Sequence, residues 1–181
     1  MKPAVKARSF AIAFLELVEK LGKPEKMVND LRQFYTVYSK DKYLKSLLLS
    51  RRIPIDSKKE VMTNSFGSSL HPAVIEFIGL LSIEKSVKLL AKIVRIVDKE
   101  YKIRNNIVDV DILTSRELDD DVLDEIKEFI KQKDGRTAVI NTDIDKSIIG
   151  GIKLRIGNTI VDGSVANKLN QLKNTLLSSS N

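Results

Sequence analysis

The spacing of apolar residues changes from a helical period to a strand period near residue 105. Through residues 1–105, apolar side chains recur every three to four positions, which is the repeat of an amphipathic helix. After that point Val108, Val110 and Ile112 alternate with aspartates, as in a strand with one buried face. We therefore expect an α+β protein, with an N-terminal six-helix bundle in residues 1–105 and a small α/β C-terminal domain in residues 106–181.

Turn-forming residues divide the first part of the chain into six helical stretches. Proline is favoured in the first turn of a helix, where its missing N–H leaves no donor unpaired, so Pro24 and Pro72 predict helix starts. Asp56 is expected to cap the helix that contains Val61 and Met62. The predicted breaks lie at residues 22–24, 40–41, 52–54, 67–72 and 82–83.

Helix and strand signals alternate in the second part of the chain. We expect Thr114 or Ser115 to start a helix, because Glu117 stands in the position of a capping box. A strand with one buried face should follow at residues 138–144. The side chains expected on the buried stripe of the helix and on one face of the strand are Leu118, Val122, Ile126 and Phe129, and Ala138, Ile140, Thr142 and Ile144.

The glycine-rich segment 144–165 predicts strand, tight turn, strand and helix cap in close succession. In it Ile152, Leu154 and Ile156 alternate with basic residues, and a Gly-Asn turn at 157–158 ends that strand. Ser164 is expected to cap the final helix. The apolar stripe of that helix would comprise Val165, Leu169, Leu172 and Leu176.

The composition excludes several kinds of chemistry. The chain has no cysteine, which removes disulfides and thiolate nucleophiles, and its one histidine is His71. A metal site around a single imidazole would need several carboxylates, and no His/Glu helical spacing supplies them. His71 precedes Pro72 and is expected to be a capping or surface residue. The sequence therefore predicts no metal and no cofactor.

Three segments resemble functional motifs but fit structural roles better. The pair Gly150-Gly151 is followed by a strand and not by a Lys-Ser/Thr pair and a helix, unlike a phosphate-binding loop. The run Asp119-Asp120-Asp121 lies at a helix start, where the helix dipole stabilises negative charge. Ser164 has no histidine near it in sequence. We find no catalytic residue and do not expect an enzyme, so a hydrolase would need a site that these patterns do not show.

The net charge of +7 is unevenly distributed. Residues 1–105 hold 21 Lys and Arg against 11 Asp and Glu, whereas residues 106–181 hold 10 against 13. This difference suggests two domains with different partners. A basic RNA-binding protein is the alternative function, but aromatic residues make up 6% of the chain and no nucleic-acid-binding motif accompanies the lysines.

The first helix has an unusually wide apolar face. Its apolar residues fill an arc of about 160°, wider than the stripe of about 100° that a surface helix needs. The helix is either embedded in its own bundle or exposes part of this face in a groove that accepts an amphipathic helix of a partner. The arc comprises Ala4, Ala7, Phe10, Ala11, Phe14, Leu15, Leu17, Val18 and Leu21.

The segment from Ile144 to Leu169 resembles the C-terminal signature of the delta subunit of F-type ATP synthases, whose mitochondrial homologue is the oligomycin sensitivity conferral protein. The similarity comprises Asp145-Lys146-Ser147 before two apolar residues and Gly150-Gly151, the Arg155-Ile156-Gly157 turn, and Asp162-Gly163-Ser164 before the last helix. The layout of an alanine-containing first helix, six helices and then a strand is similar over essentially the full length.

This resemblance implies a non-catalytic stator component. In the family, the helical domain binds the catalytic head through the N-terminal helix of an alpha subunit, and the second domain meets the C-terminal end of the peripheral-stalk b subunit. Rotation is thereby coupled to ATP synthesis. We expect these partners, no nucleic acid, and peripheral attachment to the cytoplasmic side of a bacterial plasma membrane, because the chain shows no Arg/Ser-rich transit peptide.

By analogy with the family, the groove lies between the first and fifth helices. The stalk contact is expected on the last helix. The residues predicted to bind partners are Ala7, Phe10, Ala11, Phe14, Val74, Phe77 and Ile78 for the alpha subunit, and Leu169, Leu172 and Leu176 for the b subunit.

Overall fold

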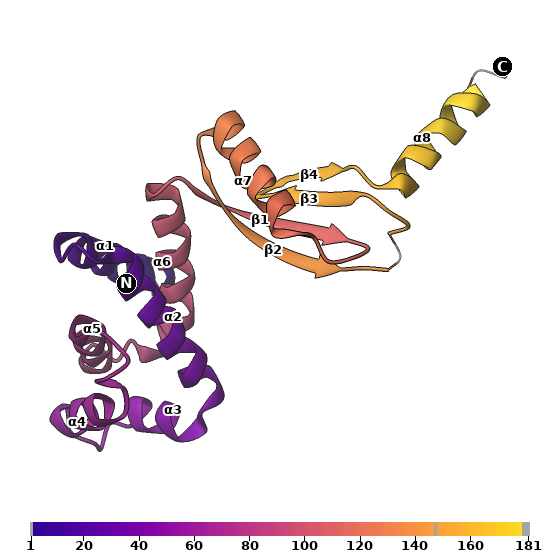
Figure 1. Cartoon of the computed structure of the whole chain (residues 1–181). Coiled ribbons are helices and arrows are strands. Elements are labelled where there is room, and N and C mark those ends of the chain that lie inside the picture. The colour runs from indigo at the N-terminus through magenta and orange to yellow at the C-terminus, as the bar shows by residue number, and fades with distance from the viewer. Residues whose placement is uncertain (1, 147, 179–181) are drawn as a thin grey trace. The chain divides into compact units, whose positions relative to one another are not determined.

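The computed structural model describes residues 2–146 and 148–178, with side chains through residue 172. The chain divides into two compact units, Met1–Tyr101 and Lys102–Asn181. Helices make up the first unit, and the second combines helices with one sheet (Figure 1). The α+β class expected from the sequence is confirmed.

The N-terminal unit consists of helices that begin where the sequence provides start signals. Pro24 and Pro72 each stand in the first turn of a helix, as predicted, and the Nδ1 atom of His71 accepts a hydrogen bond from the Ala73 amide at 3.2 Å. The elements are α1 (Pro3–Lys20), α2 (Pro24–Lys40), α3 (Lys42–Leu49), α4 (Ile55–Phe66), α5 (Pro72–Ile83), the 3₁₀ turn η1 (Val87–Leu89) and α6 (Leu90–Arg104).

The expectation that Asp56 caps the fourth helix is wrong. That helix begins at Ile55, its N-cap is Pro54, and no side chain caps it. Asp56 therefore lies inside the first turn, where its carboxylate meets the positive end of the helix dipole. The helix therefore starts two residues earlier than a cap at Asp56 would place it.

The core of the N-terminal unit draws side chains from nearly every helix. Burial of these apolar groups is the main force that holds the short helices together, since helices of this length are marginal in isolation. The largest fully buried side chains of the unit are Phe14, Leu15, Met27, Leu31, Phe34, Met62, Ile78, Leu81, Leu90 and Ile93.

The C-terminal unit is built on a four-stranded sheet with the order β2-β1-β3-β4. Strand β1 pairs parallel with β2 and antiparallel with β3, and β3 pairs antiparallel with β4. A helix, α7, packs on one face of the sheet (Figure 1). The elements are β1 (Ile107–Thr114), α7 (Asp120–Asp134), β2 (Thr137–Ile144), β3 (Ile152–Ile156), β4 (Thr159–Asp162) and α8 (Val165–Ser178).

The predicted alternation along β1 is confirmed by burial, whereas in β2 Thr142 and Ile144 are exposed although Ala138 and Ile140 on the same face are partly buried. Val108, Val110 and Ile112 are at most 4% exposed and pack with Ile130 of α7. The polar residues of β1 face the other side, where the Asn141 amide donates to Asp111 at 3.0 Å. The core of this unit is therefore a single layer between α7 and one face of the sheet.

The predicted start of α7 is wrong by several residues. The helix begins at Asp120, not at Thr114 or Ser115, and Glu117 lies before it. Thr114 is instead the last residue of β1, where its carbonyl accepts the Asp145 amide at 2.8 Å. Pairing between strands therefore holds Thr114 in β1, although the capping-box pattern assigned this residue to the start of the helix.

The glycine-rich segment folds back on itself between β2 and α8. Gly151 has a φ of +80°, and a Cβ there would lie 2.5 Å from the Gly163 carbonyl oxygen. The Val165 amide donates to the Gly150 carbonyl at 2.9 Å, and the Asn167 amide donates to the Ser164 hydroxyl at 3.2 Å. These contacts confirm the turn, the close approach and the serine cap that the sequence predicts.

Candidate partner-binding surfaces

Seven of the ten residues predicted to bind partners lie on α1 and α5. The ring centroids of Phe14 and Phe77 are 4.7 Å apart, which joins the two helices. Six of the seven are buried, with exposed fractions of 5% or less, and Phe10 alone is half-buried. The buried ones are Ala7, Ala11, Phe14, Val74, Phe77 and Ile78.

The exposed apolar residues of α1 lie on one flank of its buried face. At about 100° per residue, Phe10, Leu17 and Leu21 fall within about 40° of one another. Leu17 and Leu21 are 40% and 47% exposed. Part of the wide apolar arc therefore faces outward, and the part that does so differs from the residues chosen from the sequence.

The C-terminal end of α5 adds exposed apolar surface near the start of α1. Leu80 and Ile83 are 46% and 56% exposed. They stand beside Glu84, whose carboxylate and carbonyl oxygens lie 3.2 and 3.0 Å from the Lys6 ammonium of α1. This contact brings the exposed end of α5 to the start of α1.

The three residues predicted for the second partner lie on α8. At about 100° per residue the positions 169, 172 and 176 share one stripe. Leu169 and Leu172 are 53% and 61% exposed, whereas the side chain of Leu176 lies outside the described residues. The two described leucines form an apolar stripe open to solvent.

Hydrogen bonds fix the turn that leads into α8. The Ser164 amide donates to the Asp162 carboxylate at 3.0 Å, and the Lys153 ammonium lies 3.7 Å from the other carboxylate oxygen. The hydrogen bonds from Ser164, with the Lys153 charge, lower the pKa of Asp162 below its ordinary range. The ionised carboxylate therefore stabilises this turn.

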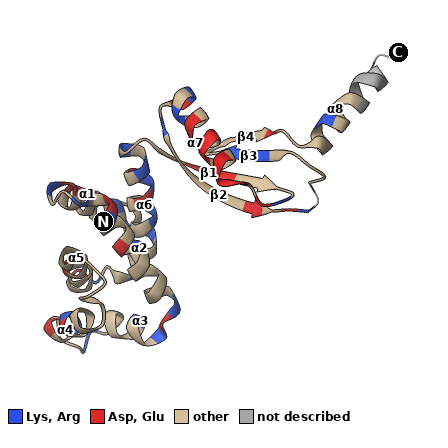
Figure 2. Ribbon diagram, in the orientation of Figure 1, with Lys and Arg blue, Asp and Glu red and all other residues tan. Residues whose placement is uncertain are grey.

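Charge differs between the described parts of the chain. Acidic residues gather on the first turns of α7, including Asp120 and Asp121, as Figure 2 shows.

No group of three or more side chains suited to a metal ion occurs in the described ranges. None of the helices in the described part of the chain is long and apolar enough to cross a bilayer.

Comparison with known proteins identifies the family. The sequence profile described as ATP synthase delta (OSCP) subunit matches residues 7–176. The chain belongs to this family. It is 28% identical to ATP synthase subunit delta of Chlorobaculum tepidum, over 98% of each chain, and 25% identical to that of Clostridium botulinum, over 94% of this chain and 95% of the relative.

A solved structure supports the fold of this delta-family chain. A chain in the cryo-EM structure of the Toxoplasma gondii mitochondrial ATP synthase hexamer superimposes with a TM-score of 0.61 at 20% identity, covering 94% of this chain and 97% of the other. Delta subunits are structural, non-catalytic components of ATP synthase, a membrane-associated complex. The resemblance read from segment 144–165 is therefore confirmed.

Sequence reasoning missed some residues of the exposed apolar surface on this delta-family chain. Leu80 and Ile83 belong to a helix that was predicted, but a sequence does not show which of its apolar residues remain uncovered. Leu17 and Leu21 belonged to the predicted arc and carried a usable signal, because they lie at its edge.

Proposed function

We propose that this chain links the catalytic head of a bacterial F-type ATP synthase to its peripheral stalk. A six-helix bundle in residues 1–105 binds the N-terminal helix of an alpha subunit, and residues 106–181 bind the C-terminal end of the b subunit. The complex holds the chain on the cytoplasmic side of the plasma membrane. Membership in the delta family over residues 7–176 supports this proposal.

The observation that carries the head contact is the apolar flank of α1. Leu17 and Leu21 are half exposed on a helix whose opposite edge is buried, and burying one leucine is worth about 1.5–3 kcal/mol. An amphipathic partner helix would cover this flank together with Leu80. Phe10 contacts the partner directly, and the buried residues Ala7, Ala11, Phe14, Val74, Phe77 and Ile78 set the surface from below.

The exposure of each side chain decides which variant tests this contact. Phe14 is 1% exposed, so a charge there would damage the core. Leu17→Asp places the charge on the exposed flank. We expect calorimetric titration with an N-terminal peptide of a bacterial alpha subunit to show affinity lowered about tenfold to a hundredfold, with helical circular dichroism unchanged.

The matched control is Val5→Asp, which replaces another exposed apolar residue by the same charge about 120–160° around α1 from the flank residues. It should change the affinity by less than about twofold, since its site is remote from the flank. Equal affinity of Leu17→Asp and the parent chain would contradict the head contact.

The stalk contact rests on the exposed stripe of α8. The double variant Leu169→Asp with Leu172→Asp should abolish binding of a C-terminal fragment of the b subunit in the same titration. Asn170→Asp, exposed on a different side of the helix, should retain it. If both variants lose binding, the loss results from added negative charge on the helix, and the proposed contact through the apolar stripe is wrong.

A further inference from the structure

Three hollows on the N-terminal unit join into one continuous trough. Their volumes are 260, 330 and 290 Å³. The first and second share Leu49, Val87 and Lys88, and the second and third share Tyr35 and Ala91. The trough formed by these three hollows, here called the basic trough, is lined by α2, α3, α6, η1 and, in the first hollow, α4 and the end of α5. It contains none of the residues proposed above for the alpha or b contacts, although the exposed Ile83 at the end of α5 lines the first hollow.

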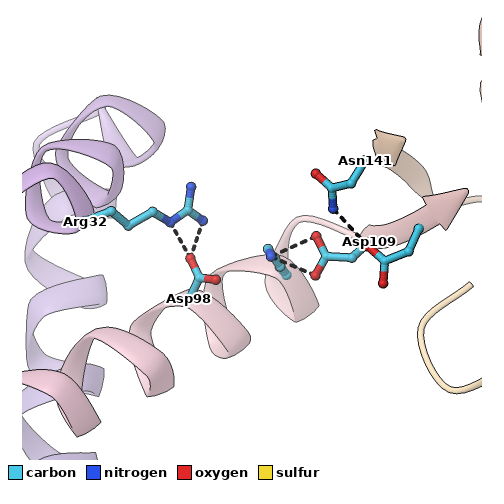
Figure 3. A network of polar contacts seen from close by, with 6 residues as sticks. Arg32, Asp98, Asp109 and Asn141 are labelled. Atoms are coloured by element: carbon cyan, nitrogen blue, oxygen red, sulfur yellow. Dashed lines mark hydrogen bonds and ion pairs between the residues drawn. The ribbon is translucent and has the colours of Figure 1, made fainter. Parts of the chain in front are cut away.

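Most of the cations that line the basic trough lack acidic partners among the described residues. Seven Lys and Arg residues line it, against the single carboxylate of Asp98. Asp98 is paired with Arg32 (Figure 3). Among the described residues, the exposed side chains of Arg51, Lys85 and Lys88 form no ion pair. The trough thus presents uncompensated positive charge.

A buried lysine adds to this charge at one end. The Lys58 side chain is 5% exposed and lines the first hollow, where its ammonium donates to the carbonyls of Leu48 at 3.1 Å and Ser50 at 2.6 Å. An ammonium group has three donors, so one remains for a further acceptor. This end of the trough suits a carboxylate.

The floor of the trough is apolar between the cations. Leu49, Val87, Ala91 and Val94 line it, which suits aliphatic side chains of a partner. Nucleic acid fits less well, because base stacking needs exposed rings, whereas Tyr38 is 95% covered by the protein and Tyr35 is half-buried. Apolar floor and basic rim together match one face of an acidic amphipathic helix.

We propose that the basic trough is a second docking surface, which binds an acidic amphipathic helix of a partner protein. Carboxylates of that helix pair with Arg51, Lys85 and Lys88, and its apolar stripe lies on the floor. None of the residues that line it belongs to α1, so a helix bound here leaves Leu17 and Leu21 on the flank of α1 open to a second helix.

The experiment measures anisotropy of a fluorescent 18-residue helical peptide, with glutamates flanking a leucine stripe, against the full-length chain. The double variant Lys85→Glu with Lys88→Glu should bind roughly tenfold more weakly at low salt, since attraction becomes repulsion at two rim positions. Lys26→Glu, an exposed charge reversal on the side of α2 away from the trough, should leave binding within about twofold.

A second variant separates the apolar floor from the charge. Ala91 is exposed where two of the hollows meet, and Ala91→Arg adds a cation there while filling the space. This variant should lower the affinity for the peptide severalfold, because the loss of apolar contact on the floor outweighs the attraction of one added charge. Stronger binding by Ala91→Arg would show that charge alone recruits the peptide and would overturn the docking surface.

Two other outcomes also overturn the proposal. Equal weakening by Lys26→Glu and by the double variant would mean that net charge, and no defined site, attracts the peptide. Binding of a single-stranded oligouridylate that depends on Lys85 and Lys88, with no binding of the acidic peptide, would assign the trough to nucleic acid. Leu17→Asp should bind the acidic peptide as the parent does, so failure of the alpha contact is distinguishable.

Discussion

The ring of Phe14 on α1 lies with its centroid 4.7 Å from that of Phe77 on α5, and the two ring planes are tilted by 44°. Both rings are at least 95% covered, so this pair joins the first and fifth helices from inside the unit. Aromatic pairs at this separation contribute about 0.5–1.5 kcal/mol beyond the area they bury. The pair therefore positions the outer flank that a partner would contact.

Replacing Phe77 by alanine should destabilise the N-terminal unit by about 3–5 kcal/mol, because it removes a buried aromatic group and its contact with Phe14. Urea unfolding followed by circular dichroism measures this change. Leu17→Ala, on the exposed flank, should cost less than about 1 kcal/mol. Similar losses from both variants would contradict the division between core and flank.

Gly151→Ala should destabilise the C-terminal unit by more than about 2 kcal/mol. The residue has a left-handed φ of +80°, and an added Cβ would lie 2.5 Å from the Gly163 carbonyl oxygen. Gly157→Ala is the matched control, with a φ of +58° but its nearest neighbour 3.7 Å away, and should cost about 1–2 kcal/mol. Thermal unfolding compares the two, and equal costs would refute the close approach.

Much of the fold followed from local patterns. The alternation of Val108, Val110 and Ile112 is a direct consequence of pleated backbone against one buried face, and burial agrees with it. Pro24 and Pro72 fixed two helix starts because the proline ring restricts φ. Signals that depend on neighbouring residues in the chain were therefore reliable.

Apart from the cap expected at Asp56, the wrong predictions concern positions whose structure is set by contacts with residues distant in sequence. Thr114 carries a capping pattern, yet pairing of β1 with its neighbours keeps it in the strand. The apolar arc of α1 likewise shows which face of the helix turns inward, but not how much of that face other helices cover. Phe14 and Leu17 both belong to the arc, yet Phe14 is buried and Leu17 is exposed. Which helix covers which part of the arc is set by packing between helices, which no local pattern records.

Asp162→Asn should destabilise the turn before α8 at pH 7 and lose this effect in acid. The hydrogen bonds from Ser164 lower the pKa of Asp162 below its ordinary 3.8, so the ionised carboxylate stabilises the folded state above that pH. This contribution disappears as the pH falls through the lowered folded pKa. Melting temperatures of the variant and the parent should thus converge in acid, once the pH falls below the lowered pKa of Asp162.

The control for this effect is Asp143→Asn, an exposed aspartate on β2. Its stability should differ little from that of the parent chain, because among the described residues no hydrogen bond or ion pair holds its carboxylate. A gap for Asp162→Asn that is the same at pH 7 and below the lowered pKa would exclude the ionised carboxylate as the stabilising group.

Lys58→Met should lower the stability of the N-terminal unit by about 1–3 kcal/mol at pH 7, because it leaves the Ser50 carbonyl without its buried donor. Burial lowers the pKa of Lys58 below its ordinary 10.5, so the unfolded chain binds the proton more tightly than the folded chain. The parent therefore gains stability as the pH rises from the lowered folded pKa towards 10.5, and the methionine variant does not. Urea unfolding at pH 7, 8.5 and 10 should show a widening gap between the free energies of unfolding of the parent and the variant.

The raised pKa values of the Tyr38 and Tyr101 phenols, which result mainly from burial, affect both chains alike and cancel in the comparison. A gap that narrows with pH would mean that Lys58 is more basic in the folded state than in the unfolded chain.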